Sequence, residues 1–215
     1  GKNAEVLKMA IDAGYRYFDT ASFYETETYL AEAIKDSGLK REDFFITSKA
    51  WKTEMGYEEV KKAFAQTLEK LGTDYLDMYL IHWPLPEDGY KDWKQLDVET
   101  WKAMEELYYS GKVKAIGVSN FLPHHIDNLL QHCKMRPAVD QIEFHPGYTQ
   151  EMTVAYCKSQ NILVQAWSPE EVRFLTMRCF RKSQHIITCP LHSYVSDMRF
   201  SGELFPFQSP LLLRE

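Results

Sequence analysis

The sequence lacks the features that mark several common classes of protein. Its 215 residues include only four cysteines, and no two of them form a CxxC pair. This usage argues against a disulfide framework and favours a reducing, cytoplasmic compartment. No apolar run approaches the roughly 20 residues of a membrane span, so no membrane partner is expected. The first residues read as an amphipathic helix and not as a secretory leader.

Basic charge is also scarce. The formal net charge is −6, whereas a nucleic-acid-binding protein normally presents a basic face. Paired histidines occur at His124–His125 and a histidine–cysteine pair at His132–Cys133, but further ligands at suitable spacing are missing. We therefore expect neither a nucleic-acid partner nor a metal site.

What the sequence does contain is an alternation of short β-rich runs with segments of helical period. The runs begin at intervals of 24 to 38 residues, which is the length of a βα unit. They cover residues 15–19, 44–48, 75–81, 113–118, 138–144 and 162–167.

Two helices stand out between these runs. Apolar residues recur at helical spacing from Val60 to Leu71 and again from Val98 to Tyr108, with Asp97 available as the N-cap of the second helix. Repeated βα units predict an α/β fold with a parallel sheet covered by helices. Because no GxGxxG or GxxxxGK loop follows any strand, a (β/α)8 TIM-type barrel is favoured over an open nucleotide-binding sheet.

Polar residues follow the predicted strands at the end where barrel enzymes carry their chemistry. Asp19 ends the first run, Lys49 follows the second, His82 follows the third, and Tyr24 lies a few residues after Asp19. A lysine held charged by a carboxylate would lower the pKa of a nearby tyrosine, which is about 10 when free. With a histidine to orient a carbonyl oxygen, such a set could protonate that oxygen while a bound cofactor supplies hydride.

The motifs around these residues resemble those of the aldo-keto reductases, a family of NADPH-dependent (β/α)8-barrel enzymes. The matching stretches lie in family order and cover residues 14–169 almost continuously. They are GYRYFDTASFY, FFITSKAW, LGTDYLDMYLIHWP, GKVKAIGVSNF, DQIEFHPGYTQ and VQAWSP.

This resemblance implies a function and a set of site residues. The function is reduction of aldehydes and ketones, with Tyr24 as the general acid, Lys49 and Asp19 tuning it, and His82 orienting the substrate. The resemblance also implies residues that bind the NADPH cofactor and residues that line the substrate pocket. The cofactor residues are Ser119, Asn120, Gln141, Trp167 and Ser168, and the pocket residues are Phe23, Trp51 and Trp83.

The sequence also departs from the family pattern. The family's first strand would precede Gly1, and beyond Pro169 its last helix and strand and its 2′-phosphate motif are not found. We therefore expect an incomplete barrel domain over residues 1–169, with about six of eight strands, and a divergent tail over residues 170–215. The alternative function is that of a catalytically impaired relative that acts as a binding or regulatory protein, and self-association through exposed strand edges is a further expectation.

Overall fold

The fold is a parallel β-sheet covered by helices. The computed structural model describes residues 4–145 and 147–168. The strands are β1 (Tyr17–Asp19), β2 (Phe45–Ala50), β3 (Leu76–Ile81), β4 (Val113–Ser119), β5 (Val139–Glu143) and β6 (Leu163–Trp167). The helices are α1 (Ala4–Asp12), α2 (Glu27–Ser37), α3 (Tyr57–Leu71), α4 (Trp93–Tyr109), α5 (Pro123–Leu130) and α6 (Glu151–Ser159), with 3₁₀ turns η1 (Ser22–Tyr24), η2 (Arg41–Asp43) and η3 (Lys52–Glu54).

The strands follow one another in the sheet in sequence order, from β1 to β6. The register is parallel for every pair from β1 to β5. At β5 and β6, Leu163 N donates to Ala138 O and Phe144 N to Trp167 O, so both strands advance in the same direction. All six predicted strands are confirmed, as is the α/β class built from repeats of the (β/α)8 architecture.

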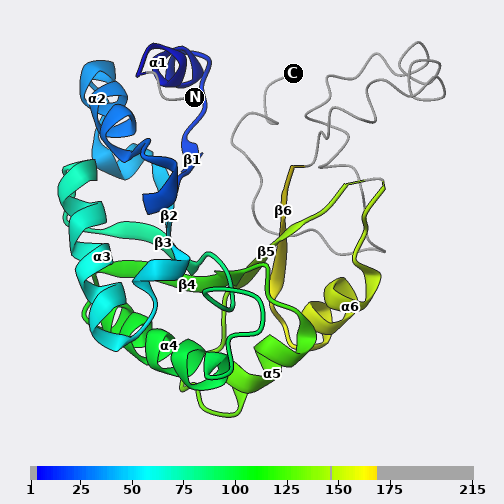
Figure 1. Cartoon of the computed structure of the whole chain (residues 1–215). Helices are drawn as coiled ribbons and strands as arrows, with labels where there is room; N and C mark the ends of the chain where they lie inside the picture. The colour runs from blue at the N-terminus through cyan, green and yellow to red at the C-terminus, as the bar shows by residue number, and fades with distance from the viewer. Residues whose placement is uncertain (1–3, 146, 169–215) are drawn as a thin grey trace, which may run out of the picture. The chain divides into compact units, whose positions relative to one another are not determined.

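The helices α2, α3, α4 and α5 lie along one side of β1 to β4 (Figure 1). The described residues form two compact units: one contains those up to Ile142 together with Gln150–Gln165, and the other contains the described residues of 143–149 and 166–168. The predicted tail at 170–215 lies outside the described residues. No helix of the described part is long and apolar enough to cross a membrane.

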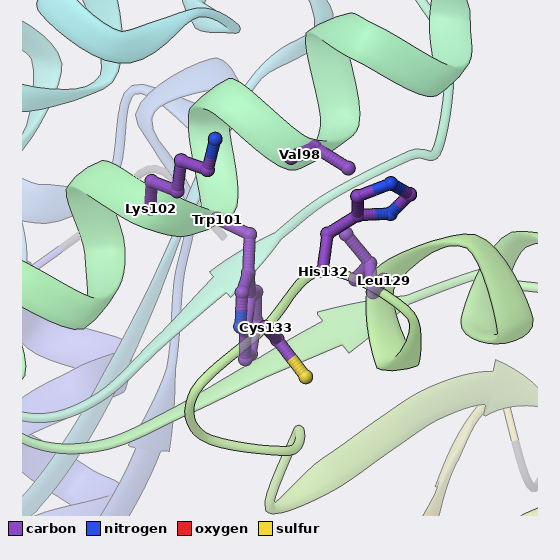
Figure 2. A pocket seen from close by; sticks show the side chains of 6 residues that line it. All are labelled: Val98, Trp101, Lys102, Leu129, His132 and Cys133. Carbon is purple, nitrogen blue, oxygen red and sulfur yellow. The ribbon is translucent and has the colours of Figure 1, made fainter.

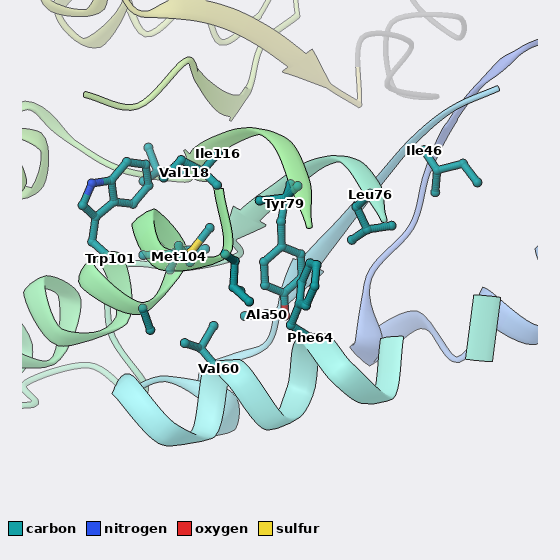
Figure 3. Packing of buried hydrophobic residues seen from close by; sticks show 14 of the residues in the cluster. Ile46, Ala50, Val60, Phe64, Leu76, Tyr79, Trp101, Met104, Ile116 and Val118 are labelled. Carbon is teal, nitrogen blue, oxygen red and sulfur yellow. The ribbon is translucent and has the colours of Figure 1, made fainter. Parts of the chain in front are cut away.

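The main core lies between the sheet and these helices. Val60 and Phe64 of α3 face the sheet, and the Phe64 ring meets Tyr79 of β3 edge-on with centroids 5.0 Å apart (Figure 3). The predicted apolar face of α3 is buried over its whole length, and the helix ends where Gly72 adopts a left-handed φ of 61°.

The prediction for α4 was wrong at its start. Asp97 is not the N-cap, because the helix begins at Trp93 after Asp92 and Asp97 lies one turn inside it. Its side chain is fully buried, and neither carboxyl oxygen has a hydrogen-bond partner among the described residues. Burial raises the pKa of Asp97 to about 9, so this residue is protonated in the folded chain at neutral pH.

A second, smaller core lies on the other face of the sheet and contains no helical residue. We call this the helix-free face. It is formed by Met78, Leu80 and Val139, with partly buried neighbours on other strands. Because side chains alternate along a strand, Leu80 and Tyr79 of β3 point to opposite faces. The helix-free face is crowded at β4, where Gly117 is the Cα partner of Leu80.

A methyl group at Gly117 should destabilise the chain. A Cβ built there lies 2.7 Å from the Val139 backbone oxygen and 2.9 Å from Leu80 Cδ2, and backbone in a sheet cannot move aside easily. We expect Gly117→Ala to lower the free energy of unfolding by about 1–3 kcal/mol, measured by urea titration. An unchanged urea midpoint would contradict this packing.

Asp97 should make stability depend on pH. The folded chain keeps Asp97 protonated up to a pKa of about 9, whereas an unfolded aspartate ionises near about 4. The unfolded state therefore binds fewer protons between these values, and the free energy of unfolding should fall as the pH rises through this window. Asp97→Asn should remove most of this fall in urea titrations at pH 5, 7 and 9. Parallel pH profiles of parent and variant would show that Asp97 ionises freely in the fold.

Candidate active site

Three of the four predicted catalytic residues are placed by the register of the sheet. Asp19 is the Cα partner of Thr47 in β2, and Lys49, two residues further along β2, is the partner of Leu80 in β3. Lys49 therefore shares the helix-free face with Leu80, and so does His82, two residues beyond Leu80. These side chains lie at the carboxyl ends of neighbouring parallel strands, above the apolar layer of the helix-free face.

The fourth residue, Tyr24, reaches the same place from η1, the turn that follows β1. Its Oη lies 3.3 Å from His82 Nε2. Lys49 Nζ donates to the Asp19 carboxylate and to the Thr20 backbone oxygen, the latter at 3.2 Å, and it lies 5.2 Å from the centroid of the Tyr24 ring. The structure thus brings Asp19, Tyr24, Lys49 and His82 together, and their catalytic roles stay a prediction.

The electrostatic environment keeps His82 neutral. Burial, and then the cations of Lys49 and Lys52, lower the pKa of the imidazole to about 3. Burial also lowers the pKa of Lys49, which is 0% exposed, while Asp19 acts in the opposite direction. A neutral His82 can donate a hydrogen bond from one ring nitrogen only.

The position of that proton follows from the burial of the other ring nitrogen. His82 Nδ1 is buried and has no hydrogen-bond partner among the described residues. An orphaned N–H in such a place is rarer than an acceptor without a donor. The tautomer protonated at Nε2 is therefore favoured, and it donates toward Tyr24 Oη, leaving the Tyr24 hydroxyl proton available to a third group.

The pKa of Tyr24 differs from the expectation. We expected Lys49 to lower it, but burial, and then the negative charge of Asp19, raise it above its ordinary value. The physical reason is that burial disfavours the charged phenolate, and the nearby Asp19 carboxylate, which pairs with Lys49, disfavours it further. Tyr24 is consequently protonated at neutral pH, which is the state that a proton donor requires.

Three of the predicted cofactor residues lie in neighbouring strands: Ser119 and Asn120 at the end of β4, and Gln141 within β5. Ser119 Oγ donates to the Gln141 backbone oxygen at 2.8 Å, and Asn120 Nδ2 donates to the His82 backbone oxygen at 3.0 Å and to Ser119 Oγ at 3.1 Å. Asn120 adopts a left-handed φ of 63°, a conformation that asparagine tolerates better than most residues. These contacts join the predicted cofactor residues directly to the backbone of His82.

Gln141 has a contact that the sequence did not suggest. Its Nε2 donates to Asp19 Oδ2 at 2.7 Å and to Gln165 Oε1 at 3.1 Å. Gln165 Nε2 in turn donates to Tyr17 Oη at 2.6 Å. A chain of hydrogen bonds therefore runs from the Asp19 carboxylate through two amides back to β1, so Gln141 orients Asp19.

Asp140 is a further residue that contacts this region, and the sequence analysis did not identify it. Phe121 N, directly after Asn120, donates to Asp140 Oδ1 at 3.4 Å, and the Cys157 thiol donates to Oδ2 at 3.7 Å. The one signal in the sequence is an acid between two apolar residues of a predicted buried strand, Val139 and Ile142, since a buried acid needs a partner.

The remaining predicted cofactor residues, Trp167 and Ser168, belong to the second compact unit. Trp167 ends β6, where its backbone oxygen accepts from Phe144 N at 3.3 Å. Ser168 has a left-handed φ of 52°. Their roles toward a cofactor stay a prediction.

The predicted pocket residues Phe23 and Trp51 form an aromatic pair beside Tyr24 and His82. Their rings stack with centroids 3.9 Å apart and planes 14° from parallel. Trp51 also meets His82 edge-on at 4.9 Å. At the third predicted pocket residue, Trp83, the Lys52 ammonium lies over the ring, 4.9 Å from its centroid.

Elsewhere on the first unit, a shallow hollow lies between α4 and α5 (Figure 2). It offers no room for even a water molecule, and burial raises the pKa of the Cys133 thiol beside it. His132 Nδ1 is bonded to Asn128 O at 2.8 Å and is not positioned as a base for that thiol. The described residues contain no group of three or more histidines, cysteines or acids that could hold a metal ion.

Comparison with known proteins places these features in a family. The family model "Aldo/keto reductase family" matches residues 2–184. The chain is 50% identical to glyoxal reductase from Bacillus subtilis over 165 residues, which are 77% of this chain and 57% of the relative. It is 41% identical to aldehyde reductase YPR1 from Saccharomyces cerevisiae, covering 74% of this chain and 58% of the relative. The chain thus spans little more than half the length of these curated relatives.

Solved structures give the same result. An aldo/keto reductase from Brucella melitensis superposes with a TM-score of 0.80 at 38% identity, covering 86% of this chain and 68% of that one. A Bombyx mori aldo-keto reductase in complex with NADP superposes with a TM-score of 0.69 at 38% identity, covering 77% of this chain and 55% of that one.

His82 should not titrate in the physiological range. Because burial and the cations of Lys49 and Lys52 lower its pKa to about 3, its ring ¹⁵N and ¹H shifts should stay constant between pH 5 and 8. Long-range ¹H–¹⁵N spectra of the chain measure this, with His82→Gln to assign the signal. A titration midpoint near the ordinary value of about 6.5 would contradict the described environment.

Proposed function

Because the chain belongs to the aldo/keto reductase family, we propose that it reduces aldehydes and ketones to alcohols with NADPH as the hydride donor. The observation that carries the proposal is the convergence of Tyr24, His82, Lys49 and Asp19 at the carboxyl ends of neighbouring strands. Glyoxal reductase and aldehyde reductase, by their names, act on carbonyl compounds.

The arrangement of this chain's own residues suits delivery of a proton to a carbonyl oxygen. The oxygen would accept the hydroxyl proton of Tyr24 and a hydrogen bond from His82 Nε2–H, the two groups that lie 3.3 Å apart. Loss of the proton leaves a phenolate on Tyr24, and the Lys49 ammonium, 5.2 Å from its ring, stabilises that charge. Asp19 holds Lys49 in place and charged.

The residues expected at the nicotinamide suit a carboxamide. Gln141 uses its Nε2 on Asp19 and Gln165, and its Oε1 has no donor among the described residues, so this oxygen can accept a bond from the carboxamide N–H. Ser119 and Asn120 offer further polar groups beside it. When bound, NADPH supplies hydride to the carbonyl carbon. Two solved structures of aldo-keto reductases are complexes with NADP or NADPH.

Removal of the Tyr24 hydroxyl should abolish most of the turnover. Tyr24→Phe should lower kcat for glyoxal by about 10²–10⁴, with the KM for NADPH unchanged, because the ring stays and only the acid is lost. NADPH oxidation followed at its absorbance measures this. Tyr29→Phe is the matched control, since Tyr29 is an exposed tyrosine of α2, and it should behave like the parent.

Two results would count against the proposal. Retained turnover in Tyr24→Phe would remove Tyr24 as the acid. If the parent chain neither quenches NADPH fluorescence nor oxidises NADPH with any aldehyde, the non-catalytic alternative is the better account.

A further inference from the structure

A single carboxylate oxygen joins the two turns that surround the aromatic pair of the site. Glu54 Oε2 accepts a hydrogen bond from Ser22 Oγ at 2.6 Å and another from the Trp51 backbone N–H at 2.7 Å. Ser22 opens η1, which ends at Tyr24, and Trp51 is the N-cap of η3, which ends at Glu54 itself. The carboxylate therefore connects the segment that carries Tyr24 to the segment that carries Trp51.

These contacts require an acceptor oxygen at residue 54. The hydroxyl of Ser22 and the backbone N–H of Trp51 are both donors, and an ionised carboxylate only accepts. Hydrogen bonds to a charged acceptor are shorter and stronger than neutral ones, which agrees with both distances. The Ser22 hydroxyl has a second acceptor nearby, the Lys49 backbone oxygen, but this oxygen lies farther from Ser22 Oγ, at 3.3 Å.

The residue between Ser22 and Tyr24 is Phe23, whose ring stacks on Trp51 at 3.9 Å. Trp51 in turn lies edge-on against His82 at 4.9 Å. The clamp formed by Ser22, Glu54 and Trp51 thus holds both members of the aromatic pair in place next to the two groups that would bind the carbonyl oxygen.

We propose that Glu54 is a positioning residue: through Ser22 Oγ and the Trp51 N–H it fixes the Phe23–Trp51 pair beside Tyr24 and His82. This inference rests on the proposed function and concerns a residue that shapes the same site, with an aromatic aldehyde as the probe of the ring pair. A small dicarbonyl such as glyoxal reaches Tyr24 and His82 with little contact to the ring pair, whereas an aromatic ring packs on it.

A purely local role for Glu54 is the competing explanation. Glu54 is the third residue of η3, and its bond to Trp51 N is an ordinary capping contact. That role needs no bond to Ser22. Ser22→Ala therefore separates the two explanations, because it removes the clamp and leaves the cap intact.

The test is steady-state kinetics of the full chain with benzaldehyde, glyoxal and NADPH. Glu54→Ala and Ser22→Ala should each raise the KM for benzaldehyde by about tenfold, the size expected when one charge-assisted hydrogen bond is lost. The KM values for glyoxal and NADPH should change by less than about twofold. Glu54→Gln, which keeps an oxygen acceptor without the charge, should lie between. Glu58→Ala, a change at an exposed glutamate of α3, is the matched control and should equal the parent.

Hydrogen–deuterium exchange provides a readout that does not depend on turnover. The amides of residues 22–24 should exchange faster in Glu54→Ala and in Ser22→Ala than in the parent or in Glu58→Ala. If Ser22→Ala leaves both the benzaldehyde KM and this exchange unchanged, Glu54 is only a local cap and the inference is wrong. If the parent does not turn over at all, the proposed function fails, and unchanged exchange at residues 22–24 then overturns the clamp separately.

Discussion

The ion pair between Lys49 and Asp19 is the constraint on which the rest of the site depends. Lys49 is 0% exposed, and a cation buried in a sheet is stable only with a paired charge and further hydrogen bonds. Asp19, at the end of β1, supplies the paired charge, and the Thr20 carbonyl accepts a further hydrogen bond. Breaking such a pair by removing one partner typically costs about 3–5 kcal/mol, so this contact holds the carboxyl ends of β1 and β2 together.

Burial, together with the acid of this pair, explains why the tyrosine keeps its proton. A lysine beside a phenol would favour the phenolate if its charge were unopposed. Here burial disfavours the phenolate, the Asp19 carboxylate adds a negative charge near it, and the pKa of Tyr24 rises. The site is therefore set to give a proton, which suits the reductive direction proposed for the chain.

Much of this arrangement could be predicted from the sequence, because parallel strands put their carboxyl ends at one edge. The strand runs that end near Asp19, Lys49 and His82 lie within a few residues of their observed bounds, and the order of strands brings these residues together. The start of α4 could not be predicted from its apolar period, since the first turn at Trp93 carries little of that pattern and Asp97 looked like a cap. The hydrogen bond from Gln141 to Asp19 could not be predicted either, because it joins residues 122 positions apart and the periodicity of a sequence reports only on neighbouring residues.

The bond between Gln165 and Tyr17 has a consequence for how the site is assembled in time. These residues are 148 positions apart and belong to the first and last strands of the sheet. During synthesis the N-terminal part of a chain emerges first, so Asp19 and Lys49 leave the ribosome long before the two amides that complete their hydrogen-bond chain. Contacts of such long sequence separation carry a large loop-closure entropy. The hydrogen-bond chain that orients Asp19 can therefore be complete only once β6 has been synthesised and has joined the sheet.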